Sequence, residues 1–349
     1  MSRLSSHAIN LLRVVLARYN VASPVIRDIR SGRVNKHWRV ETSDAIYALR
    51  RYNPRRSPAA IRYEHDVLMH LAGRGWPIAA PLRASDGATF TEVDGQRYAL
   101  FPYLAGRPAP YADPRYLHSK GQTLARLHDD LAPWSAIGQR DGFDYCWNLD
   151  TYARTRDLNT FDDLLAAFGR EEPALASAVR TERDRNRAEL ERLGADRLPS
   201  AVVHCDFHHD NILFHRRRLS ALLDFDLIHL DTRATDIATS IALDCLQPPT
   251  YDAIDPGSVQ AFLGGYLIER RLDHTELRCI VPLIRTYFLN LIAFRLTQWV
   301  DDQAGRARAS VARSVDRRFP NLDHRAHEIE TAVRAAVENT ERLNTDRSF

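Results

Sequence analysis

One short stretch of the chain holds most of the residues that could do chemistry. Residues 204–211 follow the spacing H-x-D-x-x-x-x-N, and a D-F pair comes thirteen positions after the asparagine. In this pattern Asp206 supplies one carboxylate, Asn211 supplies an amide, and Asp224 supplies a second carboxylate. That set suits phosphoryl transfer, which depends on positioning and charge neutralisation more than on covalent help from the protein.

Each polar residue of this stretch has a distinct expected role. Asp206 comes just after a predicted strand over 201–203, where a carboxylate can accept the proton of an attacking hydroxyl group. Asn211 and Asp224 flank two apolar runs that predict a hairpin, so we expect them at facing ends of that hairpin. Their oxygen atoms are the ligands that Mg²⁺ prefers.

The stretch resembles the catalytic and metal-binding loops of the small-molecule branch of the protein-kinase-like fold. This branch includes the aminoglycoside phosphotransferases, the choline kinases and the type II homoserine kinases. The family usually has His-Gly-Asp-apolar-His-Pro-x-Asn, so Cys205 stands in place of glycine and His209 in place of proline. Asp236 matches the family's Asp-x-Ala, and we expect it to be structural at a helix start.

The resemblance implies a two-lobed α+β fold with a strand-rich N-terminal lobe and a mainly helical C-terminal lobe. It implies ATP and Mg²⁺ as cofactors, with ATP bound between the lobes. It makes Asp206 the catalytic carboxylate and His204 a brace for the catalytic loop. Asp226 is expected either to assist the metal or to cap the turn that follows the metal loop, and the cap is the favoured role.

Two other interpretations remain open. The crowding of His204, Asp206, His208 and His209 also suits a metal-dependent hydrolase, although their order matches neither H-x-H-x-D-H nor H-E-x-x-H. A lone histidine such as His208 is expected to be a loop hydrogen-bonding residue. The chain could also be a nucleotide-binding module that has lost catalysis.

The N-terminal region supplies a cation and a carboxylate at matching positions. The pattern predicts strands over 38–42 and 46–50 and a helix over 58–72. Glu64 falls on the apolar stripe of that helix, where a glutamate needs a partner. Arg50 is the expected partner, with Arg51 as the alternative after a one-residue slip. The pair resembles the family's strand cation and helix glutamate, with arginine where lysine is usual.

Two further segments are assigned to the nucleotide. Gly32 lies in a reduced version of the phosphate-covering loop. Phe101, Tyr103 and Leu104 resemble the family's linker between lobes, whose backbone would bind adenine. The expected division is residues 1–104 as the nucleotide-binding lobe and residues 105–349 as the lobe with the catalytic loop, the metal loop and the acceptor pocket.

The C-terminal region is predicted to be mainly helical. One helix is predicted to start with Asp113 as its cap, a second covers about 172–193, and further helices cover most of 256–344. Between them lies one compact all-strand island at 201–226. Homoserine is the leading acceptor on overall resemblance, with an aminoglycoside or another amino sugar next. Four acidic side chains could bind an amine of the acceptor, although the favoured expectation is that each is solvated: Asp244, Asp252, Asp255 and Glu269.

Composition narrows the setting. The 349 residues carry 48 basic and 45 acidic side chains, a net charge of +3, which does not favour nucleic acid as a partner. The four cysteines form no C-x-x-C pair, and the N-terminus has no apolar signal segment. The apolar stretch 280–300 carries Arg285 and Arg295 and is expected to be a buried helix rather than a membrane span. We therefore expect a cytoplasmic enzyme; the sequence predicts no oligomeric state.

Overall fold

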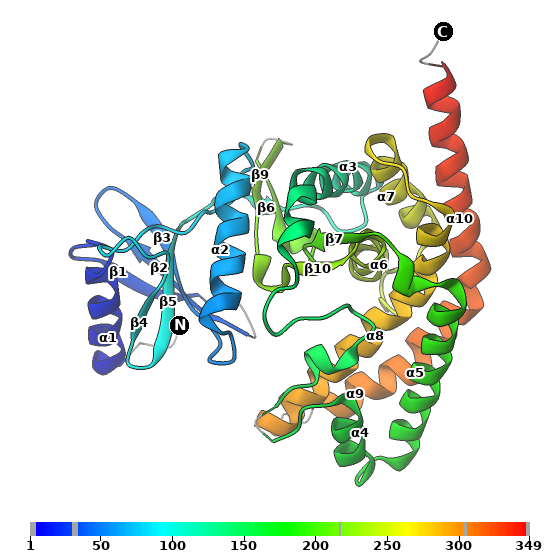
Figure 1. Ribbon diagram of the computed structural model, residues 1–349, viewed down its shortest axis with the longest axis horizontal. Helices are drawn as coiled ribbons and strands as arrows, with labels where there is room; N and C mark the ends of the chain where they lie inside the picture. Colours follow the sequence, from blue (N-terminus) through cyan, green and yellow to red (C-terminus); the bar gives the residue numbers. More distant parts are fainter. Residues whose placement is uncertain (1–4, 30–33, 156, 216–217, 303–305, 347–349) are drawn as a thin grey trace. The chain divides into compact units, whose positions relative to one another are not determined.

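The computed structural model describes residues 5–29, 34–155, 157–215, 218–302 and 306–346. Within these residues the chain divides into two compact units, each described here by itself (Figure 1). Unit 1 takes the described parts of 1–108 together with 140–142 and 210–226. Unit 2 takes 109–139 and the described parts of 143–209 and 227–349.

Unit 1 is built on an antiparallel five-stranded sheet of order β1-β2-β3-β5-β4. Its strands are β1 (Val25–Ile29), β2 (Lys36–Glu41), β3 (Ile46–Arg51), β4 (Thr91–Val93) and β5 (Gln96–Pro102). The strands and the helix that the pattern predicted between residues 38 and 72 are confirmed. Helix α1 (Ser6–Ala17) and strand β1 were not predicted.

The two faces of this sheet carry different helices (Figure 1). Helix α1 packs Leu16 against a cluster that contains Trp38 and Leu49. Because side chains alternate along a strand, the neighbouring Arg50 points to the opposite face. Helix α2 (Pro58–Gly73) lies on that face. Its start is fixed by Ser57, whose hydroxyl accepts a hydrogen bond from the Ala60 amide at 3.1 Å.

The predicted all-strand island is split between two sheets, so the expectation of one compact island is wrong. Strands β8 (Ile212–His215) and β9 (Arg218–Leu222) form a hairpin that pairs with β6 (Arg107–Pro108) in unit 1. Strand β7 (Ser200–Val203) instead pairs with β10 (His229–Thr232) in unit 2. Periodicity predicts strands but carries no information on which distant strand each one pairs with.

Unit 2 consists mainly of packed helices, and α3 and α7 lie side by side in it (Figure 1). Helix α3 begins after Asp113, whose carboxylate accepts a hydrogen bond from the Arg115 amide, as the sequence predicted. The helices are α3 (Pro114–Leu131), α4 (Phe161–Gly169), α5 (Pro173–Leu193), α6 (Arg233–Asp244), α7 (Pro256–Glu269), α8 (His274–Asp302), α9 (Arg306–Arg313) and α10 (Phe319–Asp346). A π-helical turn, η6 (Ser314–Arg318), joins α9 to α10.

Helix α8 is apolar and long enough to cross a membrane by length and composition, but 67% of its most apolar window is buried inside the structure. This burial confirms the buried helix predicted over 280–300. Its Arg285 forms ion pairs with Glu182 of α5 and Asp323 of α10. The charge is therefore neutralised within the protein, as a core helix requires.

Candidate active site

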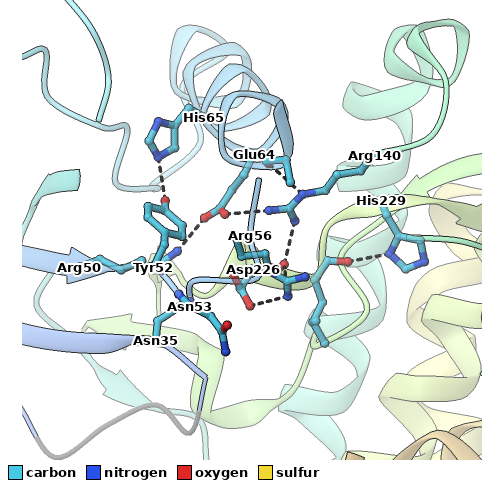
Figure 2. Close-up of polar contacts among 12 residues, drawn as sticks. Asn35, Arg50, Tyr52, Asn53, Arg56, Glu64, His65, Arg140, Asp226 and His229 are labelled. Atoms are coloured by element: carbon cyan, nitrogen blue, oxygen red, sulfur yellow. Dashed lines mark hydrogen bonds and ion pairs between the residues drawn. The ribbon is translucent and has the colours of Figure 1, made fainter. Parts of the chain in front are cut away.

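In unit 1, Glu64 is a fully buried carboxylate held by two arginines (Figure 2). Its Oε1 accepts a hydrogen bond from Arg50 Nη1 at 2.7 Å, and its Oε2 accepts one from Arg140 Nη2 at 3.1 Å. The predicted pair is confirmed with Arg50 rather than Arg51. Arg140 was not predicted, because it lies 76 positions from Glu64 in the sequence.

Burial and charge oppose each other in this group. Burial raises the pKa of Glu64 above its ordinary value, and the two arginines partly offset the rise. Burial alone would lower the pKa of Arg50, but the carboxylates of Glu64, Asp224 and Asp226 hold it above its usual range. Arg50 therefore keeps its positive charge on this face of the sheet. Its guanidinium also lies 5.2 Å from the ring centre of Phe101.

Asp226 joins the same group through Arg56 and Arg140 (Figure 2). Its Oδ2 accepts a hydrogen bond from Arg56 Nη2 at 2.9 Å, and its backbone carbonyl accepts one from Arg140 Nη1 at 2.7 Å. Burial would raise the pKa of Asp226, but Arg56 above all holds it well below its usual range. The Asp226 side chain thus forms an ion pair, rather than the turn cap expected from the sequence.

Asn211 and Asp224 occupy facing ends of the β8–β9 hairpin, as predicted. Ile212 lies opposite Leu222, and the next rung is the hydrogen bond from the Leu223 amide to the Asn211 carbonyl at 2.9 Å. Asp224 has a φ of 58°, a left-handed backbone that costs a non-glycine residue of order 1–3 kcal/mol. Two oxygen donors from one rigid hairpin suit magnesium, and their role as ligands remains a prediction.

In unit 2, Asp236 holds the loop that carries Asp206. The buried carboxylate of Asp236 accepts hydrogen bonds from the backbone amides of His204 at 2.8 Å and Cys205 at 2.9 Å. It also lies 3.0 Å from Nε2 of His128 on α3. Burial would raise the pKa of Asp236, but the His128 contact leads a set of interactions that lower it overall. The expected structural role is confirmed, and its main contacts are to the catalytic loop.

The Asp206 loop has further internal contacts. The Asp206 amide donates to Nδ1 of His204 at 3.3 Å, which is the bracing contact predicted for His204. His208 Nε2 lies 3.6 Å from Asp206 Oδ1. Burial would lower the pKa of His208, but the Asp206 carboxylate raises it overall. Cys205 has a φ of 57°, which explains why the family usually has glycine at this position.

Asp244 and Asp252 are buried, so the expectation that they are solvated is wrong. Asp244 is 1% exposed and lies 2.6 Å from Lys120 Nζ and 2.9 Å from His209 Nδ1. Burial would raise the pKa of Asp244, but Lys120 and His209 lower it to about 2. The partners of Asp244 and Asp252 are far away in the sequence, so helical spacing alone predicted that both carboxylates would be exposed to solvent.

Asp255 and Glu269 are only half-buried. Asp255 accepts a hydrogen bond from the Ser258 amide at 2.8 Å and so caps helix α7. Glu269 pairs with Arg126 at 2.6 Å on the surface. These two side chains therefore stabilise helix ends and surfaces rather than a buried cluster.

The residues that the sequence assigned to the nucleotide differ in burial, and one of them is not described by the structure. Gly32 lies outside the described residues. Phe101 is buried beside Arg50, and Leu104 is half-buried. The Tyr103 amide donates to the Ile46 carbonyl at 3.1 Å. That amide is therefore already used within the unit, while the Tyr103 side chain is exposed and lies against Arg39.

Comparison with known proteins decides the family. The model of the phosphotransferase enzyme family matches residues 25–278. The chain belongs to the phosphotransferase enzyme family. A homoserine kinase of Beijerinckia indica is 28% identical to this phosphotransferase over 295 residues, which cover 84% of this chain and 87% of the relative.

Solved structures show the same fold. A microcompartment-associated aminopropanol kinase is 18% identical with a TM-score of 0.67, over 88% of this phosphotransferase and 95% of that chain. The amicoumacin kinase hAmiN is 19% identical with a TM-score of 0.64, over 86% and 88% of the two chains. The predicted protein-kinase-like α+β fold is confirmed, as is the enzyme class, a phosphotransferase that acts on small molecules.

Family membership also weighs against the hydrolase interpretation of the histidine cluster. His204 Nδ1 accepts a backbone hydrogen bond, and His209 Nδ1 is bonded to Asp244. Each of these two histidines therefore uses one ring nitrogen in a contact within unit 2 of this phosphotransferase.

Proposed function

We propose that this phosphotransferase transfers the γ-phosphoryl group of ATP to a hydroxyl group of a small polar acceptor, with Asp206 as the catalytic carboxylate. The acceptor oxygen bonds to the γ-phosphorus while the bond to the leaving oxygen of ADP breaks. Asp206 accepts the hydroxyl proton. The observation that carries the proposal is the anchored loop, in which Asp236 fixes the two amides before Asp206.

The nucleotide side rests on Arg50 and Glu64. Arg50 is charged, braced by Glu64 and 12% exposed, so one face of its guanidinium can reach a phosphate. Phe101, Tyr103 and Leu104 are proposed to contact adenine. The amicoumacin kinase structure, of the same fold, contains AMP-PNP and Ca²⁺. We assign nucleotide binding to residues 1–104 and the catalytic and acceptor functions to 105–349.

Asn211 and Asp224 are the proposed magnesium ligands. When bound, magnesium would neutralise charge on the phosphates. The hairpin holds both residues in fixed register, and Asp224 is kept in a strained backbone conformation. Strain of this kind is common where a side chain must be aimed at a ligand.

The acceptor is proposed to be a homoserine-like amino alcohol, with an aminoglycoside or another amino sugar as the second candidate. The support is the set of homoserine kinases among the similar proteins, which match over most of their length. One fold serves many acceptors, so this choice of acceptor rests on similarity to the homoserine kinases and not on the fold.

The test measures ADP release with ATP and magnesium against L-homoserine, choline, amino sugars and aminoglycosides. We expect one acceptor class to stimulate release and Asp206→Asn to lower kcat by about 10²- to 10⁴-fold with ATP still bound. Asp184→Asn, an exposed helix residue, is the matched control and should leave kcat unchanged. Failure of the wild-type protein to bind ATP would contradict the proposal.

A further inference from the structure

Arg318 is a shielded guanidinium, and two of its nitrogens have no hydrogen-bond partner among the residues that the structure describes. It ends the π-helical turn η6 and its side chain is 13% exposed. Its Nε and Nη1 atoms are buried and make no hydrogen bond to any described residue. Such atoms cost free energy unless another group satisfies them. π-Helical turns are frequent at functional sites, which makes Arg318 a candidate to hold a ligand group.

The surroundings of Arg318 contain more positive than negative charge. The nearest carboxylate is Asp252, whose Oδ1 lies 3.9 Å from Arg318 Nε, too far for a hydrogen bond. Asp252 is already held by Arg313 at 2.5 Å and lies 3.5 Å from Arg317. Three guanidinium groups therefore share one carboxylate. Burial and the neighbouring Arg313 both lower the pKa of Arg318, as expected for a cation in a cationic surrounding.

Two observations inside unit 2 relate Arg318 to the loop that carries Asp206. Burial raises the pKa of Tyr287, the charge of Asp206 raises it further, and Arg318 and Arg295 oppose the rise. The charges of Asp206 and Arg318 thus act on the same side chain in unit 2. Arg318 also lies over the ring of the adjacent Phe288, at 5.4 Å.

The second connection is a row of rings. His209, in the catalytic loop, contacts Tyr111 with ring centres 5.1 Å apart, and Tyr111 contacts Tyr251 at 5.3 Å. Tyr251 precedes Asp252 in the chain. These ring contacts run from the Asp206 loop to the residue that precedes Asp252, the carboxylate 3.9 Å from Arg318 Nε.

We infer that Arg318 binds an anionic group of the acceptor, so that the acceptor of this enzyme is a hydroxy acid or hydroxy amino acid. A guanidinium with unbonded Nε and Nη1 atoms can donate charge-assisted hydrogen bonds to a carboxylate. The charge of Arg318 would also repel a polycationic acceptor such as an aminoglycoside. The inference rests on the proposed function, because it assigns Asp206 to the acceptor hydroxyl.

The test compares acceptors that differ only in charge. L-Homoserine is paired with homoserinol, and 4-hydroxybutyrate with its amide, for the wild-type protein, Arg318→Gln and Arg317→Gln. Arg317 shares Asp252 with Arg318, but its side chain is 64% exposed, which makes it the matched control. ADP release gives kcat and KM, and calorimetry with AMP-PNP and magnesium gives the binding of each acid without turnover.

We expect the wild-type protein to prefer an acid over its neutral partner. Arg318→Gln should raise KM or Kd for the acid by about 10- to 100-fold and leave the neutral partner and the KM for ATP unchanged. Arg317→Gln should change neither. If Arg318→Gln instead raises KM for ATP, the residue serves a nucleotide phosphate and the inference is wrong.

Two more outcomes separate this inference from the proposed function. The inference is overturned if the wild-type protein uses acid and neutral acceptors equally, or if it binds neither acid. In either case, phosphorylation of any other acceptor leaves the proposed function intact. Loss of ATP binding in the wild-type protein overturns the proposed function itself. A normal unfolding midpoint for Arg318→Gln excludes misfolding as the cause of a changed KM.

Discussion

Arg140 and Glu64 form an ion pair in which neither side chain is exposed to solvent, with Nη2 and Oε2 3.1 Å apart. The same guanidinium donates to the carbonyls of Ala60 and Asp226 at 2.9 and 2.7 Å. One side chain therefore joins helix α2 to the segment that follows Asp224 (Figure 2). Because Glu64 also holds Arg50, a change at Arg140 should affect both the stability of unit 1 and the position of Arg50.

Arg140→Met should destabilise the protein by about 3–5 kcal/mol, because it removes one of the two arginines that neutralise the buried Glu64. Urea unfolding followed by fluorescence measures the change. Arg62→Met, on the exposed side of α2, should stay within about 0.5 kcal/mol of the wild type. Equal midpoints for the two variants would show that Arg140 is dispensable.

Arg50→Gln should raise the KM for ATP by about 10- to 100-fold, because a charge-assisted contact to phosphate is lost. Arg51→Gln is its neighbour in the same strand, on the opposite face, and should leave the KM for ATP unchanged. Steady-state ADP release at varied ATP concentration measures both. A larger effect at Arg51 would reverse the assignment of the cation.

Gly265→Ala should prevent α7 from packing on α3. A Cβ atom at Gly265 would lie 1.9 Å from the backbone oxygen of His118, a position that no side-chain movement can relieve. The adjacent Gly264 has no atom within 4 Å of its Cβ position. Gly264→Ala should therefore be neutral or stabilise the helix by up to about 1 kcal/mol. Thermal unfolding of both variants makes the comparison, and similar midpoints would contradict the close approach.

His65 should make the protein less stable as the pH falls below 6.5. Burial, with Arg50 and Arg140 nearby, lowers the pKa of His65 to about 3, whereas the unfolded chain has the ordinary value of 6.5. Between these values the unfolded state binds one more proton. Stability is therefore complete above about pH 6.5 and falls by about 1.4 kcal/mol for each pH unit below it, down to about pH 3.

The measurement is urea unfolding at pH 7, 6, 5 and 4.5 for the wild-type protein, His65→Gln and His7→Gln. Glutamine at position 65 can still bond to Tyr52 or Thr89, which His65 contacts at 2.7 Å. In His65→Gln the free energy of unfolding should lose the part of its pH dependence that comes from His65. His7→Gln, exposed on α1, should keep it. Parallel slopes in all three proteins would show that His65 is not the group responsible.

The sequence by itself determined the chemistry and the local elements. The spacing of His204, Asp206 and Asn211, with Asp224 after a turn, predicted both the family and the hairpin, because each depends on short-range spacing. Glu64 on an apolar stripe required a cation, and strand alternation pointed to Arg50. These inferences succeeded because a carboxylate inside a helix face has few physical solutions.

Only the tertiary structure decided which distant partners complete those groups. Arg140 reaches Glu64, His128 and the loop amides reach Asp236, and Lys120 reaches Asp244, each across 30 or more residues of sequence. Ion pairing depends on distance in space, and periodicity within one element says nothing of which other element will pack against it. The same reason explains why β7 and the β8–β9 hairpin, neighbours in the chain, belong to separate sheets.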